Sequence, residues 1–101
     1  MDKFLSMLGI CRKAGRMCIG ASDTAEAVRR NKAILIYIAS DLSQKTEKEL
    51  RFVVGDKPIE VVRTRYDMAT LSQAIGIKTG VIAVLDQGFS EALTIKYQGE
   101  N

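Results

Sequence analysis

Four short apolar runs along the chain predict β-strands. They are residues 17–19, 34–39, 59–62 and 81–85. The second and fourth runs contain no polar residue except one tyrosine, as expected of central strands that are covered on both faces of a sheet. Glycine follows the first run at Gly20 and precedes the fourth at Gly80, which marks turns at those points.

Before, between and after these runs, apolar residues recur every three or four positions, which predicts amphipathic helices. The predicted inward positions are Phe4, Leu8 and Cys11; Ala21, Ala25 and Val28; Leu50, Val53 and Val54; Met68, Leu71 and Ile75; and Phe89, Ala92 and Leu93. Ser43 and Asp67 are suited to cap the third and fourth helices, and the second helix is expected to run to about Asn31.

Helical and extended segments therefore alternate along the chain. Such alternation is typical of α/β proteins with helices on both faces of a sheet whose strands pair mostly in parallel. We predict one domain over residues 1–101, a three-layer α/β/α sandwich with a four-stranded mixed sheet in which parallel pairs predominate. Apolar residues make up 47% of the chain, enough to form a core without disulfides or metal.

The residue types argue against catalysis. The chain has no histidine, so the usual general base at neutral pH is missing. The common glycine-rich phosphate-binding motifs do not occur, and residues 76–80 are better explained as a turn. Two thiols without histidine do not make a zinc site, so Cys11 and Cys18 are explained as small buried apolar residues. We expect no enzyme activity, no metal and no cofactor.

The apolar runs also bear on where the protein resides. None of them is long enough to cross a bilayer. Arg12 and Lys13 follow the first apolar stretch at once, which does not fit a secretion signal. We expect a cytoplasmic protein that does not associate with membranes.

Positive charge is concentrated in the first third of the chain. Residues 1–33 hold seven basic and three acidic side chains, a net charge of +4, whereas the remaining residues carry eight basic and nine acidic side chains, a net charge of −1. This asymmetry favours an anionic partner at the N-terminal third, although solvated surface charge is the usual explanation for any basic cluster.

The segment after Gly20 is the most informative part of the sequence. The glycine frees the backbone before a helix, and Asp23, Glu26 and Arg30 share one exposed helical face. A helix start offers free N–H groups and a positive dipole to a phosphate or a base edge. Alternatively, Ser22 or Asp23 caps the helix and Glu26 completes a capping box. Both roles are compatible.

Three blocks of sequence, in order and at matching spacing, resemble the L7Ae/L30e family of kink-turn-binding ribosomal proteins and their small bacterial relatives. The blocks are residues 20–30 (Gly-Ala-Ser-Asp leading into Ala-Val-Arg-Arg), residues 36–41 (Ile-Tyr-Ile-Ala-Ser-Asp) and residues 71–84, from Leu-Ser-Gln-Ala-Ile-Gly-Ile to the last strand. The resemblance covers about residues 17–93.

The resemblance implies an α/β/α sandwich that grips the kink-turn, a sharply bent RNA element. Proteins recognise distorted RNA because regular A-form helices hide their base edges. The implied partner is structured RNA of the kink-turn kind, ribosomal RNA among the candidates. We expect the protein to be a monomer. Carried over position by position, the implied RNA-binding residues are Gly20, Ser22, Asp23, Glu26 and Arg30 in the helix and Ile77, Lys78 and Thr79 in the loop.

Three of these positions depart from the family pattern. Ser22, Asp23 and Glu26 stand where the family has Asn, Glu and Lys, so base recognition should be weakened or altered. A protein-interaction adaptor on the same fold is the alternative function, favoured by Glu26. Ile77 also has two explanations: it either closes the edge of the core or covers an unstacked base.

Overall fold

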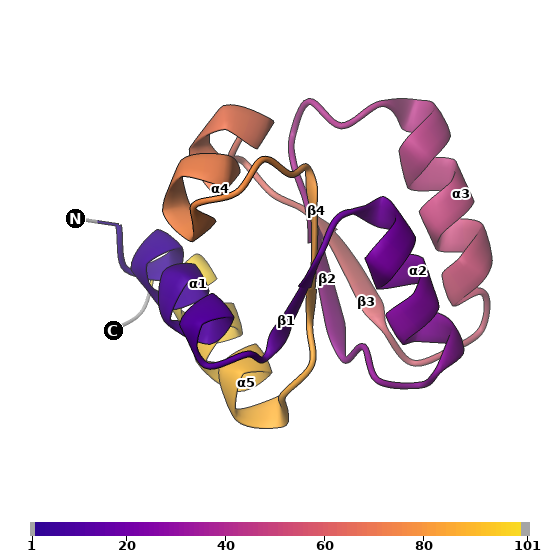
Figure 1. Cartoon of the computed structure of the whole chain (residues 1–101), viewed down its shortest axis with the longest axis horizontal. Helices are drawn as coiled ribbons and strands as arrows, with labels where there is room; N and C mark the ends of the chain where they lie inside the picture. The colour runs from indigo at the N-terminus through magenta and orange to yellow at the C-terminus, as the bar shows by residue number, and fades with distance from the viewer. Residues whose placement is uncertain (1, 100–101) are drawn as a thin grey trace.

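Helices and strands alternate along the computed structural model, which describes residues 2–99. The elements are α1 (Lys3–Lys13), β1 (Met17–Ile19), α2 (Ala21–Arg29), β2 (Leu35–Ile38), α3 (Gln44–Val54), β3 (Glu60–Arg63), α4 (Met68–Ile75), β4 (Val81–Val84) and α5 (Gln87–Tyr97) (Figure 1). Ser43 and Asp67 cap α3 and α4 as predicted, each accepting a hydrogen bond from a backbone N–H of the first turn.

The four strands form one mixed sheet in the order β1-β4-β2-β3. β4 pairs antiparallel with both β1 and β2, and β2 pairs in parallel with β3. The predicted mixed sheet is confirmed, but the predicted predominance of parallel pairs is wrong.

The reason is that the connection through α4 does not return the chain to the end of the sheet where β3 begins. Ser40 N–H donates to the carbonyl of Tyr66, just after β3, and Ala39 N–H donates to the carbonyl of Gly80, just before β4. Both points lie beside the end of β2. The chain therefore enters β4 at the end where it left β3, and β4 runs in the opposite direction.

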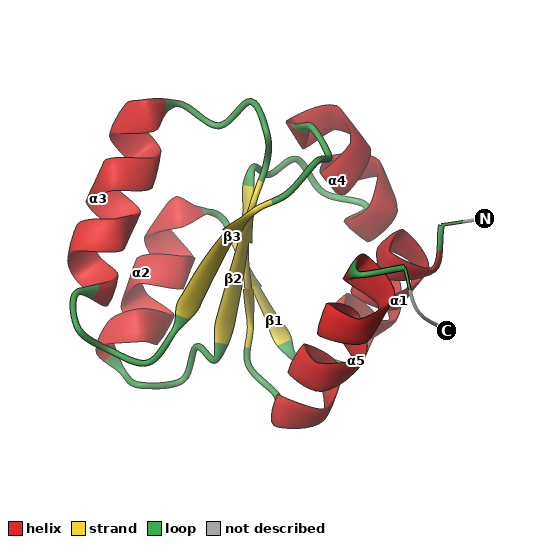
Figure 2. Cartoon of the chain, turned by 180° about the vertical axis from the view of Figure 1, so that it is seen from behind, coloured by secondary structure: helices red, strands yellow, loops and turns green. Residues whose placement is uncertain are grey.

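Two helical layers cover the sheet, with α2 and α3 on one face and α1, α4 and α5 on the other (Figure 2). Successive side chains of β2 point to opposite faces. Leu35 and Tyr37 belong to the core under α1, α4 and α5, whereas Ile36 and Ile38 belong to the core under α2 and α3. The predicted three-layer sandwich is confirmed.

The inward face of α2 differs from the prediction. Val28 is buried as expected, but Ala21 is exposed, and Thr24 and Ala27 are buried in its place. The helix ends at Arg29, because Asn31 adopts a left-handed conformation with φ 58°. In α4 the predicted inward Met68 is likewise partly exposed.

Candidate nucleic-acid interface

The α2 helix begins without a side-chain cap. Its N-cap is Gly20, with φ 97° and ψ 156°, a conformation that favours glycine, and no side chain in residues 2–99 accepts a hydrogen bond from the first turn. Ser22 and Asp23 are exposed. The capping interpretation of these two residues is therefore wrong. Within residues 2–99, the N–H groups of residues 21–23 have no acceptor, so they remain available to one outside the helix, which is the electrostatic setting that favours anions.

Gly20 also joins the start of α2 to the loop that precedes β4. Its N–H donates to the carbonyl of Val81 over 2.8 Å. The α4–β4 loop (residues 76–80) leads directly into Val81. The two segments singled out in the sequence are thus brought side by side at one end of the sheet (Figure 1).

Three of the predicted helix residues meet on one side of α2. Asp23, Glu26 and Arg30 line a shallow depression of about 230 Å³ beside the edge strand β1, together with Lys32 and the half-buried Cys18. The predicted shared face is therefore present.

Glu26 makes ion pairs with the two arginines that end α2. Its carboxylate accepts a 2.8 Å hydrogen bond from Arg30 Nε and lies 3.6 Å from Arg29 Nη1. The hydrogen bond from Arg30 is the main reason why the pKa of Glu26 is lowered. Within residues 2–99, the terminal nitrogens of Arg30 make no hydrogen bond and remain available as a fork of donors. Glu26 thus orients cations at this site.

A second glutamate, Glu47 on α3, bridges an arginine of α3 and an arginine of β3, with a different result. Glu47 accepts from Arg51 Nε at 2.9 Å and from Arg63 Nη2 at 2.5 Å. The guanidinium of Arg63 also donates to the carbonyls of Ser40 and Leu42. These donors tie β3 to the β2–α3 connection, so the Glu47 cluster serves the fold.

The α4–β4 loop has an exposed tip and a buried base. Ile77 is 45% exposed and belongs to neither core cluster, and Lys78 is exposed. Thr79 is buried, and its hydroxyl donates to the carbonyl of Val81 and accepts from the N–H of Val81. Ile77 and Lys78 are therefore presented outward, whereas the Thr79 side chain holds the loop from inside.

Three further residues support the base of this loop, and the sequence had marked only one of them, Gly80, as a turn residue. Ser72 Oγ accepts from the N–H of Thr79 at 2.9 Å. Arg12 Nη1 donates to the carbonyl of Ile75 at 2.8 Å, at the end of α4. A Cβ on Gly80 would lie 2.8 Å from Met68 Sδ, so only glycine fits there without displacement.

Thr24 is a buried polar residue in the first turn of α2. Its side chain has no exposed surface, and its hydroxyl has no hydrogen-bond partner within residues 2–99. Leaving a buried hydroxyl unpaired costs free energy of folding.

The remaining side chains that could carry chemistry form no reactive or metal-binding group within residues 2–99. Burial raises the pKa of the Cys11 thiol to about 11, and burial also raises the pKa of Cys18. Over residues 2–99, no three His, Cys, Asp or Glu side chains are grouped so that they could hold a metal ion. In the same part of the chain, no helix has the length and apolar character needed to span a membrane.

A family model decides what kind of chain this is. The model described as the ribosomal protein L7Ae/L30e/S12e/Gadd45 family matches residues 2–94. The chain belongs to this family. Two curated relatives agree with this assignment. This chain is 25% identical over 90 residues to the RNA-binding protein YlxQ of Enterococcus faecium, and the match covers 89% of this chain and 86% of the relative. It is 30% identical over 89 residues to the large ribosomal subunit protein eL30 of Eremothecium gossypii, covering 86% and 85%.

Solved structures of this L7Ae-family fold include two similar chains. A Bacillus halodurans protein of unknown function superposes with a TM-score of 0.88 at 30% identity, covering 97% of this chain and 99% of its own. A Giardia lamblia 15.5kD RNA binding protein superposes with a TM-score of 0.73 at 20% identity, covering 94% and 82%. The second likeness concerns the fold alone.

Proposed function

We propose that this L7Ae-family protein binds kink-turn-like structured RNA and catalyses no reaction. The observation that carries the proposal is the hydrogen bond from Gly20 to Val81, which joins the uncapped start of α2 to the end of the loop that presents Ile77 and Lys78 outward. The names of the YlxQ and eL30 relatives support RNA as the partner.

The two segments suit the two chemical parts of a bent RNA. The first turn of α2 presents N–H groups, Ser22 and Asp23 to base edges, and the free nitrogens of Arg30 suit phosphate or guanine acceptors. The exposed part of Ile77 is suited to cover an unstacked base. Thr79 contributes by fixing the loop.

Ser22, Asp23 and Glu26 make this site different from the family pattern. A serine lacks the paired donor and acceptor of an amide, and Glu26 engages arginines instead of donating to a base. We therefore expect an RNA whose bases at these contacts differ from those of a standard kink-turn. We place the protein in the cytoplasm, as a single-domain monomer on ribosomal or regulatory RNA.

A titration with two RNAs tests the proposal. The full chain should bind a kinked RNA more tightly than a plain duplex of equal length. Four to six phosphate contacts give a slope of log affinity against log salt on the order of −3 to −5. Lys78→Gln should make this slope shallower by about 0.9, whereas Lys96→Gln on α5, in the layer across the sheet from α2, should not. Equal affinity for duplex, or no dependence on salt, would move the assignment to the protein-interaction adaptor.

A further inference from the structure

One aromatic side chain on α3 is almost fully exposed. Phe52 is 88% exposed, whereas the next most exposed large apolar side chain within residues 2–99, that of Ile10, is 53% exposed. The α3 helix buries Leu50 and Val54 against the sheet, and Phe52 belongs to neither core cluster. The packing of the fold therefore does not account for a phenylalanine at this position.

Two lysines lie on the same outer stripe of α3. Lys45 and Lys48 precede Phe52 by seven and four positions, a spacing that places all three on one side of a helix. Both lysines are exposed, and neither takes part in an ion pair within the described part of the chain. The outer stripe thus combines a free aromatic ring with two free positive charges.

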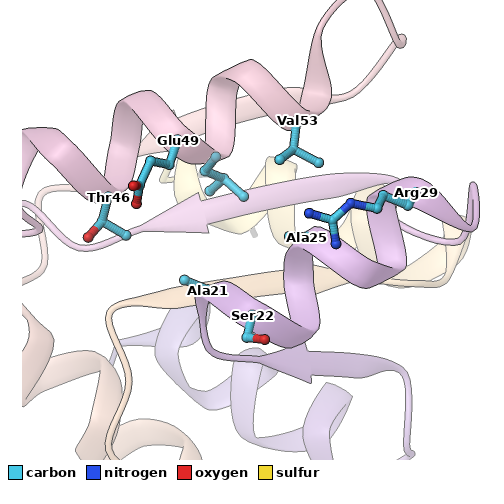
Figure 3. A pocket seen from close by; sticks show the side chains of 8 residues that line it. Ala21, Ser22, Ala25, Arg29, Thr46, Glu49 and Val53 are labelled. Atoms are coloured by element: carbon cyan, nitrogen blue, oxygen red, sulfur yellow. The ribbon is translucent and has the colours of Figure 1, made fainter.

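The two acidic side chains of α3 do not neutralise this stripe. Glu47 is engaged by Arg51 and Arg63. Glu49 is directed from α3 into the groove of about 220 Å³ between α2 and α3, which Arg29 also lines (Figure 3).

The chemistry of the stripe favours nucleic acid over protein. Proteins that bind single-stranded RNA combine aromatic rings, on which bases stack, with cations that follow the phosphates. The cores of protein interfaces are instead contiguous and poor in charge. Phe52 is a lone ring beside charged neighbours such as Lys48, so it offers no such apolar patch.

We propose that the outer stripe of α3, formed by Lys45, Lys48 and Phe52, is a second RNA-binding site. Phe52 stacks on an unpaired base, and the two lysines contact neighbouring phosphates. The inference rests on the proposed function, because its RNA is the one bound at α2. An unpaired strand that leaves this bound element reaches α3. The geometry permits this path, because α2 and α3 lie side by side and begin at the same end of the sheet (Figure 1).

Single-stranded extensions test the site. The full chain is titrated with a minimal kinked RNA, with the same RNA extended by a short unpaired strand at either end, and with a duplex carrying the same extensions. At least one extension should tighten binding. Phe52→Ala should lower affinity for that extended RNA about fivefold or more, since base stacking on an aromatic ring has roughly that effect. Binding of the minimal RNA should not change.

Two substitutions separate stacking from apolar contact. Phe52→Trp should keep the gain from the extension, whereas Phe52→Leu should lose it, because leucine is apolar but has no ring to stack on. Ile10→Ala on α1 is the matched control, an exposed apolar side chain on the other layer, and should have no effect. Circular dichroism should show the same fold for every variant.

The results also distinguish this site from the proposed function. If the kinked RNA is bound and the extensions add nothing, or Phe52→Leu keeps the gain, the α3 site is refuted and the proposed function stands. If the kinked RNA is bound no better than duplex, the proposed function fails. In that case a Phe52-dependent gain from extensions on the duplex still supports the α3 site, and the absence of such a gain refutes it as well.

Discussion

Replacing Ile77 tests the proposed contribution of the α4–β4 loop to RNA binding. Fully burying an isoleucine side chain is worth about 1.5–3 kcal/mol. Because Ile77 is 45% exposed, covering the rest of it with a base is worth about 1 kcal/mol, or about fivefold in Kd. We expect Ile77→Ala to weaken binding to kinked RNA by about threefold to fivefold. Ile77→Asp adds a negative charge near phosphates and should weaken binding by more than about tenfold.

Fluorescence anisotropy with labelled kinked RNA measures these Kd values, and urea denaturation measures stability. Ile77 lies outside both core clusters, so Ile77→Asp should lower the free energy of unfolding by about 1 kcal/mol or less. Ile95→Asp on α5 is a closely matched control, because Ile95 is 44% exposed. Equal losses of affinity from Ile77→Asp and Ile95→Asp would refute the assignment of Ile77 to the interface, as would full affinity in Ile77→Asp.

Three further substitutions test other parts of the structure. Thr24→Val removes a buried hydroxyl without a partner and should raise the free energy of unfolding by about 1 kcal/mol in urea denaturation; a decrease would show that the hydroxyl is paired in solution. Glu26→Lys should tighten binding to a standard kink-turn about tenfold, since a lysine donates to guanine acceptors. Glu91→Lys on α5 makes the same change of charge in the opposite layer, so equal gains from both variants would contradict a groove contact by α2. The pKa of Cys11 is raised from 9.0 to about 11, so ionisation of this thiol in the unfolded chain alone should lower the free energy of unfolding as pH rises from about 9 to 11. The pKa values of Cys18 and Tyr37 are raised as well, so Cys11→Ala should make this slope shallower without abolishing it, and an unchanged slope would refute the contribution of Cys11.

The strands were predictable from sequence, but their neighbours were not. Runs such as residues 34–39 and 81–85 are apolar throughout because both faces of β2 and β4 are covered, and that requirement is visible in the sequence. Whether two strands run parallel or antiparallel depends on whether the connection between them returns the chain to the other end of the sheet. The eight residues of α4 predict a helix but do not show that β4 begins where β3 ends.

The inward face of α2 was misplaced because its residues are small. Ala21 and Ala25 have little apolar surface, so their positions say little about which side is buried, and the buried Thr24 is polar. Large side chains such as Phe4 and Leu8 in α1 made the face of that helix predictable.

The candidate site was predictable as a set of positions but not as a set of interactions. Spacing alone placed Asp23, Glu26 and Arg30 on one face. The hydrogen bond that Arg30 donates to Glu26 follows an i,i+4 spacing that is visible in the sequence, but only the geometry could separate the competing roles of Glu26. The capping roles of Ser22 and Asp23 failed because Gly20 itself begins the helix.

The division of the α4–β4 loop into a buried base and an exposed tip has a consequence for divergence within the family. Thr79 and Gly80 fix the path of the loop through buried hydrogen bonds and close packing against Met68. Ile77 and Lys78 make no comparable contribution to the core. New side chains at those two positions therefore change what the loop touches while the scaffold stays intact. A duplicated copy of this gene can then acquire a different RNA target through substitutions that hardly change the free energy of unfolding.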